Sequence, residues 1–230
     1  MVDGTDGSGK STIVSAWKKY LTDQGNAIFD LKKYWIDDNK YPDLKETHAY
    51  EFIFSAEMTN VGIGQVIREE LINKNNHYPP LAIAQAYSLD RLILYTKIII
   101  PILQMDKIII QDRGVSSSLA YQSSMDGLDI NTVADLIGNK NALEHRPDYL
   151  IIVDTDPEIA TKRITGRTDK QDNAIFEQLE TITKIHKKFH SPEYQKLFTD
   201  RGTKIIYLNG NEKIDIMETQ AIDLLKSILK

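Results

Sequence analysis

The sequence predicts an α/β fold in which helices cover both faces of a central parallel sheet, and two observations support this prediction. Short apolar runs alternate with longer stretches of helical periodicity, as in parallel sheets covered by helices. Each of the clearest runs is also continuously apolar, which is typical of a strand buried on both faces. The expected strands are Lys107–Gln111, Tyr149–Asp154 and Lys204–Leu208, with weaker candidates at Ala27–Leu31 and Phe52–Ser55.

Helices are expected in the longer stretches between these strands. Asp156 followed by Pro157 is typical of a helix N-cap and first helical position. Two polar stretches, Lys32–Thr47 and Gly166–Asn173, are expected to be loops. The expected helices are Lys10–Gln24, Gly64–Asn73, Leu81–Gln104, Asn131–Leu143, Glu158–Thr165 and Ile214–Leu229.

The length fits one large α/β domain or two small ones, and the two polar stretches are too closely built into the pattern of strands and helices to suggest separate domains, so a single domain over residues 1–230 is expected. Hydrophobic residues make up 41% and charged residues 27%, which is ordinary for a globular protein. The absence of cysteine excludes disulfides, thiolate metal sites and cysteine nucleophiles, and it fits a cytoplasmic location. The longest apolar run, Ile98–Leu103, is too short to span a bilayer, and no signal-peptide pattern is present. With a net charge of −5 and no basic run, neither a polynucleotide nor a membrane is an expected partner.

A complete phosphate-binding motif lies near the start of the chain. Residues 4–11 (GTDGSGKS) match G-x-x-x-x-G-K-[ST], whose glycines let successive backbone N–H groups point at phosphate oxygens. Lys10 is expected to neutralise the β- and γ-phosphates of ATP, and the Ser11 hydroxyl to bind Mg²⁺. The alternative is a glycine-rich turn that only caps a helix. The residues expected to bind ATP here are Gly4, Asp6, Gly7, Ser8, Gly9, Lys10, Ser11 and Thr12.

This motif predicts a P-loop NTPase-type three-layer fold but does not separate kinases, ATPases and GTPases. A GTPase would usually carry an N-K-x-D motif, and the nearest string, Asn139–Ala142, lacks the aspartate. A P-loop normally follows a buried strand, yet only Met1–Asp3 precede Gly4. We therefore expect a truncated first strand, which either an upstream extension of the reading frame or another segment would complete.

A second motif follows the expected strand Lys107–Gln111. Asp112 and Arg113 lie at its carboxyl end, the edge of an open α/β sheet where ligands bind. Asp112 can hold Mg²⁺ or its waters, and Arg113 can grip an acceptor phosphate with two parallel hydrogen bonds. The alternative is a strand-end salt bridge.

Five blocks resemble the thymidylate kinase family in order and approximate spacing. The combination of D-R, a run of serines and A-Y-Q is the most specific of these features. The blocks are GTDGSGKST (4–12), VGIGQVIREEL (61–71), AYSLDR (86–91), DRGVSSSLAYQ (112–122) and RPDYLIIVDTDPEIATKRI (146–164). The resemblance implies an ATP- and Mg²⁺-dependent kinase of a nucleoside monophosphate, most specifically of dTMP.

The resemblance also implies roles for individual residues on the acceptor side. Asp6 matches an acid near the sugar 3′-hydroxyl and the metal, and Tyr87 matches an aromatic that stacks on thymine. Arg91, one helical turn later, can reach the base edge. The expected substrate-binding residues are Asp6, Glu57, Tyr87, Arg91, Arg113, Ser118, Tyr121 and Gln122. Tyr87 could instead belong to the core, and Arg91 could be a snorkelling or paired arginine.

Further expectations concern the lid, the quaternary structure and the differences from the family. The resemblance places a lid at about residues 165–175, where Arg163 and Arg167 would bind ATP, although both could be solvated helix charges. It also implies a possible homodimer. The family's tyrosine after D-R is Gly114 here, its R-E-P-G-G-T stretch is replaced by AEMTNV (56–61), and an insertion covers about 32–50. The five histidines show no ligand spacing and receive no role.

The predicted reaction is in-line attack by the acceptor phosphate on the γ-phosphorus of ATP. Lys10, Arg113, Asp6 and Arg167 are the expected catalytic residues, and Ser11 and Asp112 the expected metal ligands. No general base is needed, because the acceptor phosphate is already ionised near pH 7. One alternative is a deoxynucleoside kinase, for which Glu57 is the candidate base. Another is a nucleotide-binding protein without catalytic activity.

Overall fold

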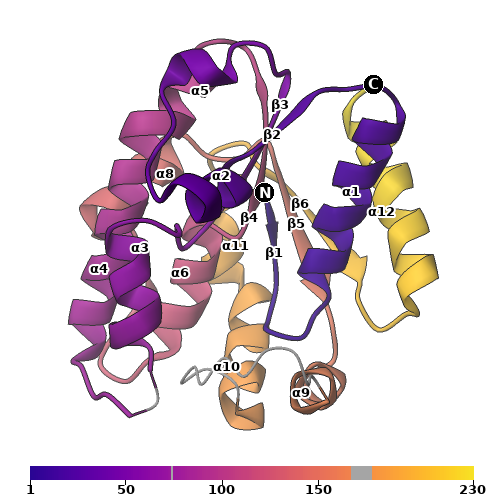
Figure 1. Ribbon diagram of the computed structural model, residues 1–230. Coiled ribbons are helices and arrows are strands. Elements are labelled where there is room, and N and C mark those ends of the chain that lie inside the picture. The colour runs from indigo at the N-terminus through magenta and orange to yellow at the C-terminus, as the bar shows by residue number, and fades with distance from the viewer. Residues whose placement is uncertain (74, 167–177) are drawn as a thin grey trace.

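The computed structural model describes residues 1–73, 75–166 and 178–230 (Figure 1). Its centre is a six-stranded, all-parallel sheet in the order β2-β3-β4-β1-β5-β6, which confirms the α/β prediction. All five expected strands are present, with ends within one residue of those predicted. The strands are β1 (Val2–Asp3), β2 (Ile28–Asp30), β3 (Phe52–Ala56), β4 (Ile108–Asp112), β5 (Tyr149–Asp154) and β6 (Lys204–Asn209).

Helices cover both faces of the sheet, and each face has its own apolar core (Figure 1). α1 and α12 pack on one face, and α4, α6 and α8 lie on the other. The helices are α1 (Lys10–Asp23), α2 (Leu31–Asp38), α3 (Ile63–Val66), α4 (Pro80–Leu94), α5 (Ile100–Leu103), α6 (Val115–Tyr121), α7 (Ile130–Asp135), α8 (Ile137–Glu144), α9 (Pro157–Thr165), α10 (Leu179–Phe189), α11 (Pro192–Thr199) and α12 (Ile214–Ile228). Short 3₁₀ turns lie at Leu44–Thr47 and Gln122–Ser124, and π-helical turns at Ile67–Leu71 and Tyr95–Ile99.

The two-residue strand β1 lies at the centre of the sheet. Val2 is aligned with Asp112 of β4 on one side and with Ile151 of β5 on the other. Val2 is fully buried, and its carbonyl accepts a hydrogen bond from the Arg113 N–H at 2.8 Å. The short strand therefore joins the two halves of the sheet directly in front of the P-loop.

The expected loop at Lys32–Thr47 is wrong, because this stretch contains helix α2 and a 3₁₀ turn. The Asp30 side chain caps α2 by accepting hydrogen bonds from the N–H groups of Lys32 and Lys33. Leu31 and Trp35, four residues apart, bury one face of the helix in the core. The expected insertion at about 32–50 is thus partly helical.

Two expected helices differ from the structure, one where distant segments pack together and one near a proline. The span Asn131–Leu143 breaks at Leu136 into α7 and α8, and a Cβ on Gly138 would lie only 1.8 Å from the Ser88 carbonyl oxygen. The break lets α8 approach α4 closely at this glycine. The span Leu81–Gln104 is helical throughout but includes a π-helical turn just before Pro101, which has no N–H to donate. Helices α6, α10 and α11 were not expected.

No helix in the described ranges is both long and apolar enough to span a bilayer.

Candidate active site

The P-loop connects β1 to α1 at the carboxyl edge of the sheet. Its backbone needs glycine where neighbouring segments come close. Gly7 has a φ of 77°, and a Cβ there would lie 2.2 Å from the Ala160 carbonyl oxygen of α9. Thr155, just after β5, donates from its hydroxyl to the Ser8 carbonyl at 3.0 Å. The loop is therefore held on one side by α9 and by the segment after β5.

Lys10 is a buried cation whose ammonium is held by neutral groups. Its Nζ donates to the carbonyl oxygens of Gly4 and Thr5 at 3.0 and 2.6 Å. Burial lowers the pKa of Lys10 to about 8, and Asp6 and Asp3 partly oppose that shift. Only 6% of the residue is exposed, so an anionic group that reached the ammonium would interact with it strongly.

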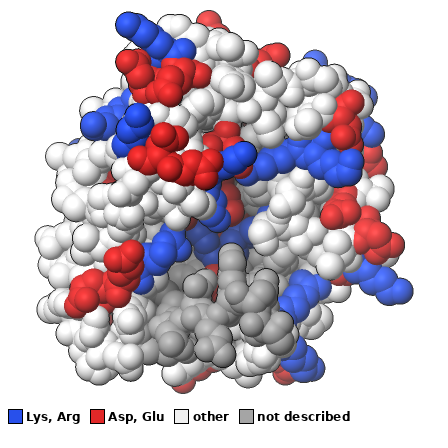
Figure 2. Space-filling view, in the orientation of Figure 1, with Lys and Arg blue, Asp and Glu red and all other residues white. Residues whose placement is uncertain are grey.

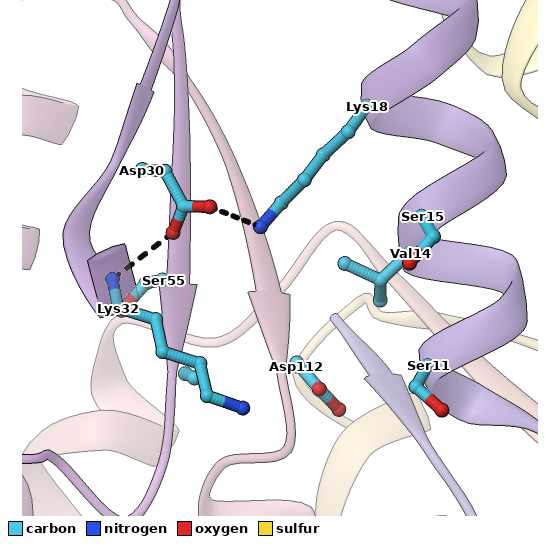
Figure 3. Close-up of a pocket in the computed structure, with 9 residues that line it drawn as sticks. Ser11, Val14, Ser15, Lys18, Asp30, Lys32, Ser55 and Asp112 are labelled. Carbon is cyan, nitrogen blue, oxygen red and sulfur yellow. Dashed lines mark hydrogen bonds and ion pairs between the residues drawn. The ribbon is translucent and has the colours of Figure 1, made fainter. Parts of the chain in front are cut away.

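Ser11 and Asp112, predicted to hold a metal, line one cavity of about 100 Å³ (Figure 3). Ser55 of β3 and Lys32 of α2 line the same space. Among the described residues, neither Asp112 Oδ1 nor the Ser55 hydroxyl has a hydrogen-bond partner, although both are buried. Buried oxygen atoms without partners, one of them a carboxylate, fit a hard cation such as Mg²⁺.

Arg113 projects from the end of β4 over the P-loop. Its φ of 64° is uncommon for a residue with a side chain, and such conformations cluster at functional sites. The guanidinium forms an ion pair with Asp6 at 2.5 Å and lies 3.6 Å from Asp3. It also donates to the Gly4 carbonyl at 3.4 Å, the same oxygen that Lys10 contacts. The strand-end salt bridge considered from the sequence is therefore present, and it crosses to the P-loop.

Tyr121 of α6 completes this group. Its hydroxyl lies 3.2 Å from Asp6 Oδ2 and 3.3 Å from Arg113 Nη1. The Arg113 guanidinium also lies 5.2 Å from the centre of the Tyr121 ring, at cation–π range. The structure thus brings together Asp6, Arg113 and Tyr121, which were predicted separately to contact the acceptor.

Glu57 and Arg91 form a buried ion pair at 2.6 Å, with 4% and 1% of their side chains exposed. Gln111 donates to the other Glu57 oxygen at 2.8 Å. Burial raises the pKa of Glu57, and the Arg91 charge opposes that shift. The expectation that Arg91 could be a paired arginine is confirmed, while its contact with a base edge stays a prediction.

The other predicted acceptor residues surround this pair. Ser118 accepts a hydrogen bond from Arg91 Nη2 at 3.0 Å, and Gln122 is buried one turn later along the chain. Gln122 Oε1 has no partner among the described residues. Tyr87 is half-buried against the larger core. Burial raises its pKa, the Arg113 charge opposes that shift, and the Asp6 charge adds to it. Tyr87 therefore packs in part against the core, and its stacking on a base stays a prediction.

The two arginines expected at the lid differ. Arg163 of α9 donates to the carbonyl oxygens of Gly210 and Glu212 at 2.7 and 3.3 Å, which fastens the loop after β6. Its predicted contact with ATP stays a prediction. Arg167 and most of the expected lid, residues 165–175, lie outside the described residues.

Three residues near the site were not predicted. Asp3 is fully buried and accepts hydrogen bonds from the Gly4 N–H and the Ser117 hydroxyl. Asn139 accepts from Arg91 Nη1 and holds its guanidinium from α8. Lys32 lines the cavity that also contains Ser11 and Asp112. The sequence could have indicated Asp3, because an acid directly before a P-loop must lie at the edge of the sheet. Nothing in the sequence indicated Asn139, which is 48 residues from Arg91.

Basic side chains gather around a hollow in the middle of this face, as Figure 2 shows. The carboxyl ends of the strands point toward the same part of the molecule in Figure 1. Local positive charge at this edge can attract phosphates even though the chain as a whole carries a net charge of −5.

A profile of the thymidylate kinase family matches residues 41–221. The chain belongs to this family. Thymidylate kinases are ATP-dependent phosphotransferases, so the predicted family and enzyme class are confirmed. The profile match begins after the P-loop, whereas similarity to individual relatives covers up to 99% of this chain.

Three curated relatives illustrate the similarity. A thymidylate kinase of Clostridium novyi is 28% identical over 93% of this chain and 91% of its own length. A thymidylate kinase of a Thermoanaerobacter species is 26% identical over 99% and 96%, respectively. A probable thymidylate kinase of Methanococcus aeolicus is 29% identical over 96% and 91%. The thymidylate kinase architecture therefore extends over nearly the whole chain.

Gly114, which replaces the family's tyrosine, is explained locally. A Cβ at Gly114 would lie 2.4 Å from the Met1 methyl carbon. The Gly114 carbonyl also accepts from Arg91 Nη2 at 3.1 Å. A side chain at position 114 would therefore require the flexible Met1 side chain to move, and the backbone there supports Arg91.

Proposed function

We propose that the protein transfers the γ-phosphoryl group of ATP to the phosphate of dTMP, giving ADP and dTDP. One observation carries the proposal beyond family membership. Lys10 on the donor side and Arg113 on the acceptor side both donate to the carbonyl of Gly4, at 3.0 and 3.4 Å. Two cations that meet at one oxygen can bracket a phosphoryl group moving between two phosphates.

On the donor side, the P-loop N–H groups and Lys10 bind the phosphates of ATP. The phosphates replace the carbonyl partners of the Lys10 ammonium with stronger, charged ones. Ser11 and Asp112 would hold Mg²⁺, which supplies neutralisation of phosphate charge when bound. Arg163 and Arg167 are assigned to the ATP side on the resemblance alone.

On the acceptor side, Arg113 binds the phosphate of dTMP. An acceptor phosphate competes with Asp6 for the guanidinium, so Asp6 becomes available to the sugar 3′-hydroxyl. A phosphate oxygen attacks the γ-phosphorus as the bond to the β,γ-bridging oxygen breaks, and ADP leaves. The developing charge falls between Lys10 and Arg113.

The remaining acceptor residues select the nucleoside. Tyr121 lies beside Asp6 and excludes a 2′-hydroxyl, and Tyr87 stacks on the base. Arg91, fixed by Glu57 and Asn139, offers only hydrogen-bond donors to the base edge. Ser118 and Gln122 line the same pocket.

The contacts of Glu57 argue against the deoxynucleoside kinase alternative. That reaction needs a carboxylate to take the proton of a neutral 5′-hydroxyl. Both Glu57 oxygens are engaged, one by Arg91 at 2.6 Å and the other by Gln111 at 2.8 Å. We therefore assign Glu57 to orienting Arg91 rather than to base catalysis.

Measuring ADP formation with dTMP, with thymidine and without acceptor tests the function. We expect rapid ADP release only with dTMP, and none above background in the Lys10→Ala variant. Release with thymidine as the preferred acceptor would support a nucleoside kinase. No acceptor-dependent release would support a protein that only binds nucleotides.

The single domain, cytoplasmic location and homodimer stay predictions. Leu89 of α4 and Ile137 of α8 are exposed apolar side chains on two helices that pack together, with 44% and 69% exposure. Light scattering on the purified protein, with Leu89→Glu for comparison, would test whether this face pairs two copies.

A further inference from the structure

Asp154, His186 and His190 form a cluster outside the residues assigned to the kinase reaction. Asp154 ends β5, and the two histidines lie four residues apart on α10. Nε2 of His186 and of His190 lies 2.8 and 2.9 Å from Asp154 Oδ1. The expectation that the histidines show no ligand spacing is therefore wrong for this pair, since residues four apart share a helix face.

The three side chains offer metal-ligating atoms at short range. One ligand atom from each residue lies within 4.8 Å of the other two. A tetrahedral Zn²⁺ with bonds of about 2.1 Å needs ligand atoms roughly 3.3 Å apart. Small rotations of exposed or half-buried side chains cover that difference, so the backbone need not move.

Neighbouring groups orient one of the histidines. The His190 ring stacks on Tyr207 of β6, with ring centres 4.7 Å apart and planes 15° apart. The Tyr207 hydroxyl donates to the Phe189 carbonyl at 2.9 Å and accepts from Gln195 at 3.0 Å. Tyr207 is thus fixed by α10 and α11, and such outer contacts commonly hold a ligand ring in place.

We propose that Asp154, His186 and His190 form a site for a divalent transition-metal ion of the zinc type, with solvent completing the coordination. Two imidazoles and one carboxylate suit Zn²⁺, Co²⁺ or Ni²⁺, whereas Mg²⁺ prefers oxygen ligands alone. The site is therefore chemically distinct from the Ser11–Asp112 cavity.

The bound ion would join α10 to the end of β5. Asp154 directly precedes Thr155, which holds the Ser8 carbonyl of the P-loop. Occupancy should therefore stabilise the folded protein and fix the strand end that supports the P-loop.

Titration of the full-length protein with Co²⁺ and Zn²⁺ tests the site. We expect one equivalent of Co²⁺ to bind and give a visible absorption spectrum typical of nitrogen ligands, unchanged by excess Mg²⁺. Zn²⁺ should displace the Co²⁺ spectrum and raise Tm by roughly 5 °C or more at a hundredfold excess over Kd.

Variants decide whether the cluster is responsible. His190→Ala and Asp154→Asn should weaken Co²⁺ binding by more than about tenfold, the scale of losing even an outer contact of a metal site. His77→Ala, which removes an exposed histidine elsewhere, should bind like the original protein. Equal binding in all four proteins, or no Co²⁺ spectrum with nitrogen ligands, would overturn the proposal. Circular dichroism of the metal-free variants confirms that each is folded.

Discussion

Lys10 and Arg91 are both buried cations, but they are held in opposite ways. The Lys10 ammonium contacts two neutral carbonyl oxygens, whereas the Arg91 guanidinium is paired with the Glu57 carboxylate. A cation held by neutral groups gains much from an incoming phosphate, while a cation in a complete ion pair gains little. We therefore propose that Lys10 stabilises charge during transfer and that Arg91 sets the shape and polarity of the acceptor pocket.

The largest expected effect is on stability. Glu57→Ala leaves Arg91 as a buried charge without its carboxylate and should lower the free energy of unfolding by about 3–5 kcal/mol. Lys10→Met removes a buried charge that has no direct carboxylate partner and should change the free energy by less than about 1 kcal/mol, or raise it. Urea unfolding of both variants measures this. If Glu57→Ala were no more destabilised than Lys10→Met, the two cations would not differ as described.

The next effect is on catalysis. Lys10→Ala should lower kcat by about a hundredfold or more, comparable to losing one preorganised charge-stabilising donor. Arg113→Ala should raise the KM for dTMP and lower kcat while ATP affinity stays within a few-fold of the original. Steady-state kinetics and nucleotide titrations separate the two. A loss confined to ATP affinity in Arg113→Ala would move this residue to the donor side.

A smaller effect concerns base selectivity. The Arg91 Nε–H has no partner among the described residues and can only donate. It therefore favours thymine and uracil, which present an O4 acceptor, over cytosine, which presents an amino group. An unpaired buried donor costs about 1–3 kcal/mol, so dTMP should exceed dCMP by roughly five- to a hundredfold in kcat/KM. The expected order is dTMP, then dUMP, then UMP and dCMP. Competition among the four is the test, and dCMP or a purine nucleotide as best acceptor would contradict the thymidylate assignment.

The smallest expected effect is the uptake of a proton by Lys10 when ATP binds. Burial sets the Lys10 pKa to about 8, against 10.5 for an ordinary lysine, so near pH 9 Lys10 is mostly neutral before ATP binds. Phosphate favours the ammonium form, and ATP binding at pH 9 should take up as much as about one proton. Between pH 8 and 10.5 the unfolded chain binds more protons at this residue, so Lys10 makes stability rise with pH there.

Calorimetry at pH 9 in buffers of different ionisation enthalpy measures the proton uptake. The Lys10→Met variant is the control and should show none of the Lys10-linked uptake. The same uptake in both proteins would mean that another group is responsible.

The sequence predicted the sheet and the meeting of Ser11 and Asp112 at one cavity well, for physical reasons. Strands buried on both faces are continuous apolar runs, and the P-loop brings its functional groups together within eight residues. Ser11 and Asp112 could be placed together because carboxyl ends of parallel strands share one edge.

Other features depend on long-range packing that no local pattern carries. The break between α7 and α8 follows from the approach of Gly138 to Ser88, and Arg91 is fixed by Asn139 from another helix. Helix α6 contains three consecutive serines, which have modest helix propensity, so packing determines it. The sequence shows that His186 and His190 are four residues apart. It does not show that both contact Asp154, which lies on a distant strand.

The proposed reaction is phosphoryl transfer between two phosphates bracketed by Lys10 and Arg113. Its most direct test is to incubate the protein with ATP, Mg²⁺ and dTMP and to quantify ADP and dTDP by ion-exchange chromatography. We expect equal amounts of ADP and dTDP, formed only when dTMP is present. ADP without dTDP, or conversion of thymidine to dTMP in preference to dTMP to dTDP, would contradict it.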